Sequence, residues 1–425
     1  MNNQTNQSAF GRVLHQTVTR RNQRDSGYRQ VSALAGAASA LYLTLLSQQK
    51  SRLRLIITDT FETAEQIIQD LTLFSPPKGI CFFPHWDTLP YDNQSPDKEA
   101  VAARFFALSQ LIENRCHTVV TTPNALMQKI LPVSVFSENC LTLTVSESYD
   151  RKNVTQKFVN MGFVRVDMVE EKGEFAIRGE IIDIFPIGTN DPVRLDFFDD
   201  ELESLSYFDV ENQRSGDQLD AVLLSPAKEV LYSDQGIQLA LNQLIELKTN
   251  TLPVTYHSVQ EAIENQMTFP GIESLLPLFY QSTCSILDYF RESPQIVFID
   301  QEKIAERSKL YFDEIGNEYQ YSLHEGNPTL SPDRLFVPPD ELFINLKQYN
   351  QLNLLKSNLD NESPIQVSTV DNAAIRSISM DPDKIGQSAI HNILTQLKTW
   401  NRAGSKVVVA VSSRSKADRL RQMLI

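Results

Sequence analysis

Between residues 53 and 130, short apolar segments typical of buried strands alternate with longer segments of helical periodicity. The predicted strands span 53–57, 79–83 and 117–121, and the predicted helices span 61–73, 95–113 and 122–130. Ser95–Pro96 and Thr122–Pro123 are typical helix starts, because a hydroxyl side chain caps the first turn and proline fits within it. Strands that alternate with helices form a parallel sheet covered on both faces. The pattern therefore predicts a parallel, doubly wound α/β domain over roughly residues 25–135.

A different pattern follows residue 140, where strand-like segments succeed one another without long helices between them. We predict a strand at 141–145, a short helix at 155–161 and several strands within 174–209. Val193, Leu195 and Phe197 alternate with Arg194, Asp196 and Phe198, and Asp199–Asp200 then forms a turn. A period of two places the first three side chains on a buried face and the other three on the opposite face. The sequence therefore predicts an inserted α+β domain.

Phe198 is the unusual residue of this strand, because it shares the polar face with Arg194. The two residues are four positions apart, or about 13 Å along a strand. Arginine and aromatic residues are enriched at the energetic centres of protein interfaces. The pattern thus favours a protein-binding surface. The alternative is that Phe198 packs beneath its own hairpin and that the arginines pair with Asp196 or Glu203.

The C-terminal part returns to mixed helix and strand patterns. We predict a helix at 237–247, a strand at 295–300, connecting segments at 326–340 and 358–372, a helix at 385–400 and a strand at 407–411. A last helical pattern is still in progress at Ile425. We therefore expect the chain to be the front part of a longer protein.

Composition excludes several classes of protein. The 425 residues are sufficient for two to four domains, and the net charge of −14 argues against a dedicated nucleic-acid surface. The four cysteines and six histidines show no ligand spacing, so neither a disulfide framework nor a metal site is expected. The polar N-terminus lacks a signal-peptide pattern, and the apolar segment 34–46 is too short to span a bilayer. We expect a cytoplasmic protein without membrane contact.

Residues 34–40 have the pattern of a loop that enters a helix. A phosphate loop of a nucleotide hydrolase needs glycines, a lysine for the phosphates and a serine or threonine for Mg²⁺. In this segment Gly36 is the single glycine, and no lysine is present. Without that cation the loop cannot stabilise charge on a γ-phosphate, so we expect no hydrolysis there.

Three stretches in combination resemble the N-terminal region of the bacterial transcription-repair coupling factors. They are His-Trp-Asp-Thr-Leu-Pro-Tyr-Asp at 85–92, Arg-Gly-Glu-Ile-Ile-Asp-Ile-Phe-Pro at 178–186 and Arg-Leu-Asp-Phe-Phe-Asp-Asp-Glu at 194–201, with weaker similarity at 277–280 and 288–290. That region is similar in turn to the first two domains of the excision-repair helicase UvrB. The resemblance implies a degenerate helicase-like domain in two segments, 1–139 and 227–367. It also implies an inserted UvrA-binding domain at 140–226 and the start of a small α/β domain of unknown function at 368–425.

The resemblance also assigns residues. The family's UvrA-binding positions correspond to Arg178, Arg194 and Phe198, whose residue types are retained. UvrB's acidic Mg²⁺ motif corresponds to 300–303, where Asp300 is kept and Gln301 replaces the glutamate that activates water. Together with Gly36, these residues form a degenerate nucleotide site. UvrB's long DNA-clamping hairpin has no room here, because the helix start at Ser95–Pro96 closely follows Tyr91–Asp92.

The expected function is therefore a non-catalytic UvrA-recruitment module of a coupling factor. In the full-length family, RNA polymerase, double-stranded DNA, ATP and Mg²⁺ are bound by parts that follow Ile425, so no cofactor is expected for these residues. One alternative is an ATP-dependent excision-repair helicase subunit that binds damaged DNA directly. Another is a DNA-binding module that uses the basic residues near the two ends, Arg20, Arg21, Arg24, Arg29, Arg414, Lys416, Arg419 and Arg421.

Overall fold

The computed structural model describes the central part of the chain almost continuously. The described residues are 28–32, 34, 36–49, 53–74, 79–356, 365–366, 397–400, 402–404, 415, 418–419 and 421–422. The chain divides into two compact units, residues 1–366 and residues 367–425. The second unit is described at only a few positions, so the strand predicted at 407–411 lies outside the described residues, as do Arg20, Arg21, Arg24, Arg414 and Lys416.

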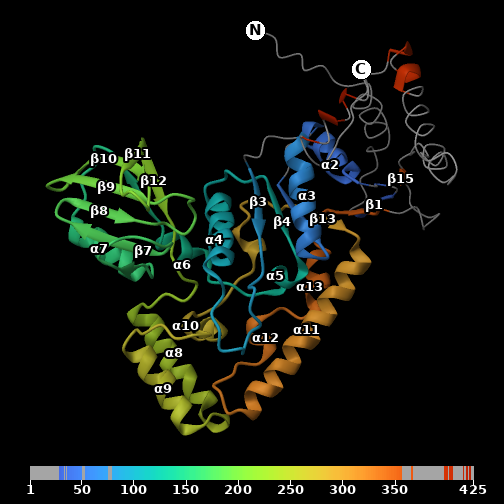
Figure 1. The fold of residues 1–425 in the computed structure, drawn as a ribbon. Coiled ribbons are helices and arrows are strands. Elements are labelled where there is room, and N and C mark those ends of the chain that lie inside the picture. The colour runs from blue at the N-terminus through green and yellow to red at the C-terminus, as the bar shows by residue number, and fades with distance from the viewer. Residues whose placement is uncertain are drawn as a thin grey trace. The chain divides into compact units, whose positions relative to one another are not determined.

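A parallel sheet forms the centre of the first unit (Figure 1). Its seven described strands are β1 (Tyr28–Ser32), β2 (Arg54–Thr58), β3 (Ile80–Phe83), β4 (Thr118–Thr121), β13 (Gln295–Ile299), β14 (Gln351–Leu354) and β15 (Ile365–Gln366). Their order is β15-β1-β14-β13-β2-β4-β3, and every neighbouring pair is parallel. Strands from two distant chain segments therefore share one sheet. The predicted parallel α/β fold is confirmed.

Both faces of this sheet are buried, as its apolar strands require. Leu55 and Ile57 of β2 pack in one core cluster with Phe105 and Ile304, which lie on α4 (Lys98–Ile112) and α11 (Gln301–His324). Ile56 points to the opposite face, because strand side chains alternate, and α3 (Phe61–Phe74) contacts β2, β3 and β4. The remaining helices over this part are α2 (Ala38–Gln49), α5 (Pro123–Met127), α6 (Val133–Glu138), α12 (Pro332–Leu335) and α13 (Pro339–Leu346).

A second, largely antiparallel sheet is inserted between β4 and β13. Its strands are β6 (Val164–Arg165), β7 (Glu174–Arg178), β8 (Ile181–Ile184), β9 (Val193–Phe198), β10 (Glu201–Phe208) and β11 (Ser215–Gln218), in the order β11-β10-β9-β8-β7-β6. The predicted alternation in β9 is confirmed, because Val193, Leu195 and Phe197 are buried. They share a core with α7 (Arg151–Asn160), where the Phe158 ring meets Phe175 edge-on at 5.5 Å.

The insert is connected to the rest of the unit by a short sheet and a helical region. Strands β5 (Leu141–Thr144) and β12 (Ala221–Leu224) pair at the point where the chain enters and leaves the insert. Helices α8 (Asp234–Leu247), α9 (Pro253–Glu264) and α10 (Leu276–Phe279) follow, and Figure 1 shows α8 and α9 side by side.

Several predicted details were wrong. Asp97, not Ser95, caps α4, because its carboxylate accepts the backbone N–H of Glu99 at 2.7 Å. The predicted connecting segment 326–340 contains α12 and the start of α13. The sequence reading also missed α11, a 24-residue helix. Its buried residues Ile304, Ser308, Tyr311 and Ile315 recur at helical spacing, so a signal for this helix was present in the sequence.

A buried ion pair connects α4 to the segment that leaves the insert. Arg104 donates from Nε to Glu229 Oε1 at 2.5 Å, and the two side chains are each 1% exposed. Arg104 Nη1 also donates to the Pro84 carbonyl at 2.8 Å and to Gln128 Oε1 at 3.0 Å. Trp86 Nε1 donates to Glu229 Oε1 at 3.2 Å. The conspicuous His-Trp-Asp stretch thus helps to satisfy a buried charge.

We predict that Glu229→Leu lowers the free energy of unfolding by about 3–5 kcal/mol, because it leaves a buried guanidinium without its carboxylate. Urea denaturation measures this loss. The double variant Arg104→Met/Glu229→Leu should lose less, since both charges are removed. The matched control is Glu171→Gln in the exposed Lys98–Glu171 pair, which should lose far less because solvent screens that pair. An equal loss of unfolding free energy in the control and in Glu229→Leu would contradict a stabilising role of the buried Arg104–Glu229 pair.

Candidate functional site

The three residues singled out by sequence, Arg178, Arg194 and Phe198, lie on the same face of the six-stranded sheet. Arg178 is on β7 and pairs in register with Ile181, which pairs in turn with Asp196 on β9. Residues two apart on a strand share a face, so Arg194 and Phe198 lie on the face of Asp196. The opposite face is the one that packs on α7. One face of the sheet therefore builds the core, and the other presents these residues.

Asp183 of β8 lies between the two arginines and binds both. Arg194 donates from Nε to Asp183 Oδ1 at 2.7 Å and from Nη2 to Oδ2 at 3.1 Å. Arg178 Nη2 also donates to Asp183 Oδ2. The Asp183 side chain is fully buried. Bidentate pairing of this kind fixes the plane of the guanidinium as well as its position.

The two arginines differ in access to solvent. The Arg194 side chain is 14% exposed and the Arg178 side chain is 42% exposed. Arg194 Nη1 donates to the Gln213 carbonyl at 3.0 Å, and its guanidinium carbon lies 4.7 Å from the centre of the Phe208 ring. Arg178 Nη2 donates to Gln213 Oε1 at 3.2 Å. Arg194 is therefore mostly part of the scaffold, whereas Arg178 retains donors that an outside group can reach.

Phe198 is 69% exposed, the highest value among the aromatic side chains in the described part of the chain. It ends β9 directly before the turn, where Asp199 adopts a φ of 57° and Phe198 pairs in register with Glu201. The alternative in which Phe198 packs beneath its hairpin is therefore wrong. The ion pairs with Asp196 or Glu203 in that alternative are also wrong, because both arginines bind Asp183. That these residues bind a partner stays a prediction.

The sequence reading assigned no role to Asp183, Phe208 or Gln213. A signal for Asp183 existed, because it is the one charged residue in the strand Ile181–Ile184. An acidic residue in a buried strand requires a partner, but several basic residues were available. Only the register of β7, β8 and β9 selects Arg178 and Arg194.

The residues of the predicted degenerate nucleotide site lie at one edge of the parallel sheet. Gly36, with a φ of 58°, follows β1, and Asp300 follows β13. These strands flank β14, so their carboxyl ends are roughly 10 Å apart. Asp300 caps α11 and pairs with Lys303 at 3.3 Å, while the backbone N–H of Gln301 donates to Asn353 Oδ1 at 3.1 Å. Asp300 thus has a structural role in this arrangement.

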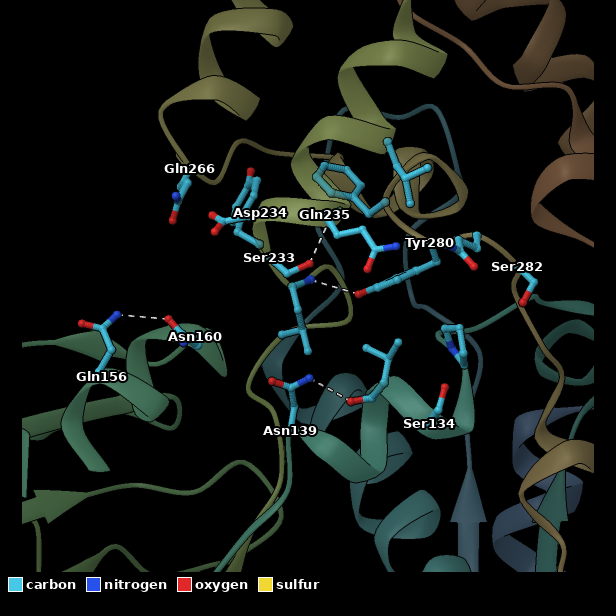
Figure 2. A pocket seen from close by; sticks show the side chains of 18 residues that line it. Ser134, Asn139, Gln156, Asn160, Ser233, Asp234, Gln235, Gln266, Tyr280 and Ser282 are labelled. Carbon is cyan, nitrogen blue, oxygen red and sulfur yellow. Dashed lines mark hydrogen bonds between the residues drawn. The ribbon is translucent and has the colours of Figure 1, made fainter. Parts of the chain in front are cut away.

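A groove of about 650 Å³ lies between α6, α7 and the start of α8 (Figure 2). Its labelled residues are mostly amides and hydroxyls, and Gln156 Nε2 donates to Asn160 Oδ1 at 3.1 Å. The Tyr280 hydroxyl accepts from the Leu231 N–H at 3.0 Å and donates to the Glu229 carbonyl at 2.7 Å. Burial raises the pKa of Tyr280, which keeps this donor protonated. The groove has no nucleophile–base arrangement among its described residues.

Two further features, metal clusters and membrane spans, are absent from the described residues. No group of three or more His, Cys, Asp or Glu side chains in the described residues could hold a metal ion. Among the described helices, none combines the length and the apolar character needed to cross a membrane.

Comparisons with known proteins agree on one family. The family model described as UvrB interaction domain matches residues 141–230. The transcription-repair-coupling factor of Haemophilus influenzae is 31% identical over 316 residues, which cover 74% of this chain and 27% of the relative. The Escherichia coli factor is 30% identical over 337 residues, which cover 78% of this chain and 29% of the relative. The Staphylococcus haemolyticus factor is 25% identical over 407 residues, which cover 93% of this chain and 34% of the relative.

The fold and the match at 141–230 define a protein in which a UvrB-type interaction domain is inserted into a parallel α/β unit. The chain spans about a third or less of the length of the curated relatives that it matches. With matches over 72–93% of its residues, the chain belongs to the transcription-repair-coupling factor family. The resemblance seen in the sequence is thereby confirmed.

The geometry at Asp183 predicts a large effect of its removal on stability. Asp183→Leu should lower the free energy of unfolding by about 3 kcal/mol, because Arg194 is left mostly buried without a counter-ion. Asp196→Asn is the matched control on the same face, since the described residues provide no ion pair for it; its expected loss is about 0.5 kcal/mol or less. Urea denaturation measures the unfolding free energy of both variants. Similar losses in the two would argue against a stabilising ion pair between Asp183 and the arginines.

Proposed function

We propose that this chain is the UvrA-recruiting part of a transcription-repair coupling factor in the bacterial cytoplasm. The whole protein would recognise RNA polymerase stalled at DNA lesions, release it in an ATP-dependent manner and bring in nucleotide excision repair. The observation that carries the proposal is the outer face of the six-stranded sheet within the matched domain, which carries both an exposed aromatic ring and a half-exposed arginine.

The chemistry of this face suits a protein partner better than nucleic acid. Arg178 and Arg194 share one buried carboxylate, so much of their charge is neutralised within the sheet. A phosphate backbone requires several unpaired cations. Phe198 can instead fill an apolar pocket of the partner, and the outward donors of Arg178 can bind a carboxylate. In this proposal Phe198 and Arg178 are the two anchors that contact the partner, and Arg194 supports Arg178.

The nucleotide-type edge of the sheet supports a recruiting role over a motor role for these residues. The loop at Gly36 has no lysine, Gln301 replaces an acid, and Asp300 caps a helix. Residues 91–97, where a DNA-clamping hairpin would begin, contain neither helix nor strand. In the proposed whole protein, ATP, Mg²⁺, double-stranded DNA and RNA polymerase are bound by other parts.

We predict that Phe198→Ala and Arg178→Ala each weaken binding to UvrA by roughly thirtyfold, because interface anchors cost about 2 kcal/mol on truncation. Isothermal titration calorimetry with purified UvrA measures the effect. Val159→Ala and Arg165→Ala are the matched controls, since both side chains are exposed elsewhere in the same domain. Arg194→Lys tests the supporting role with less risk to folding.

Circular dichroism melting establishes that each variant is folded before binding is compared. Unchanged affinity in a folded Arg178→Ala/Phe198→Ala double variant would refute the assigned surface. Failure of the unaltered chain to bind UvrA would refute the recruiting function itself.

We predict that the chain does not hydrolyse ATP above the rate of buffer, because a cation for the γ-phosphate and an acid to activate water are both missing. A phosphate-release assay with Mg²⁺ and double-stranded DNA tests this. Turnover that survives Asp300→Ala would indicate a contaminating enzyme, whereas turnover abolished by Asp300→Ala would overturn the prediction.

A further inference from the structure

A pocket of about 260 Å³ lies where the start of α4, strands β6 and β7 and the segment after β12 meet. It is distinct from the proposed UvrA-binding face, because its lining includes Glu174 at the start of β7, whereas Arg178 ends that strand. Three lysines contribute to its lining, Lys98, Lys172 and Lys228. Much of the remaining wall is apolar, with Val101, Ile187 and Ala227.

Two of these lysines are already neutralised. Lys98 pairs with Glu171 at 2.5 Å and Lys172 pairs with Glu99 at 2.8 Å. Lys228 differs, because no carboxylate of the described residues lies within ion-pair distance of it. Its Nζ donates to Thr268 Oγ1 at 2.8 Å. One ammonium group of the pocket thus has a neutral partner only.

Lys228 is held in this position by packing. Its aliphatic stem crosses Gly162, where an added Cβ would lie 3.1 Å from the Lys228 Cγ. Partial burial lowers the pKa of Lys228, Glu273 opposes this shift, and the nearby charge of Lys98 adds to it. Taking a cation out of water without a counter-ion is costly. A bound anion would supply the missing counter-ion.

The carboxylates that line the pocket are engaged elsewhere. Glu229 is paired with Arg104. Glu174 Oε2 accepts the backbone N–H groups of Glu170 and Glu171 at 2.9 and 2.8 Å. Glu273 Oε2 accepts from Ser95 Oγ at 2.8 Å, and burial raises the pKa of Glu273. Glu273 thus offsets part of the cost of burying the Lys228 charge, but none of these carboxylates forms an ion pair with Lys228.

We propose that this pocket binds a small molecule that carries a phosphate or carboxylate group. Lys228 is the main ligand of the anionic group, and the apolar wall covers the rest of the molecule. The ligand would lie between α4 and the insert, and it would stabilise this junction because it binds only the folded state. The proposal is independent of UvrA binding.

The test uses phenyl phosphate and benzoate, which join each anionic group to an apolar ring, with benzamide as the uncharged control. We expect saturable binding of at least one anion at millimolar concentration or below, measured by calorimetry, and an accompanying rise in the melting temperature. Lys228→Met keeps the stem over Gly162 and should weaken binding at least about tenfold, the loss expected for one charge-assisted hydrogen bond. The two anions distinguish a phosphate from a carboxylate ligand.

Lys152→Met is the matched control, since this exposed lysine lies on α7, outside the pocket. Lys228→Arg, which keeps the charge, should retain more affinity than Lys228→Met. Equal binding by the unaltered chain and a folded Lys228→Met variant would overturn the proposal. The absence of saturable binding for both anions, or equally tight binding of benzamide, would also overturn it.

Discussion

The buried pair between Arg104 and Glu229 is the interaction on which the arrangement of the first unit depends. It joins residues 125 positions apart, one on a helix of the parallel sheet and one on the segment that leaves the insert. Gln128 and the Pro84 carbonyl complete the hydrogen bonds of the guanidinium, and Trp86 completes those of the carboxylate. A buried pair is favourable only when such additional bonds satisfy both charges. The insert is therefore held to the parallel sheet by a specific network within a continuous apolar core.

The same principle operates on the outer face of the insert, with a different consequence. Asp183 is fully buried but binds two arginines, of which one is mostly buried and the other half-exposed. The Asp183 carboxylate thus restricts the conformations of the Arg178 side chain at the surface. Less side-chain entropy is therefore lost when a partner binds. Phe198 needs no such support, because it is the last residue of a strand whose preceding alternate residues, Val193, Leu195 and Phe197, are anchored in the core. A rigid sheet can in this way present a proposed recognition surface.

At the carboxyl edge of the parallel sheet, the residues predicted to form a degenerate nucleotide site have structural roles. Asp300 caps α11 and pairs with Lys303, and Gln301 is bound through its N–H to Asn353. The junction pocket at Lys228 is a separate feature, created where the insert meets α4. The proposed activities are therefore located on the insert and at its boundary, while the sheet provides the support.

The sequence by itself determined the parallel α/β fold, the alternation in 193–198, the missing lysine near Gly36 and the family. These features are encoded by neighbouring residues, whose spacing follows the local period of strand or helix. The predictions did not include α11, although its buried residues recur at helical spacing. The sequence could not select Asp183 as the partner of both arginines, or Glu229 as the partner of Arg104. Many other charged residues along the chain were equally available as partners. Only the tertiary structure decided these pairs, since strand register and contacts over more than a hundred residues determine which charges are buried together.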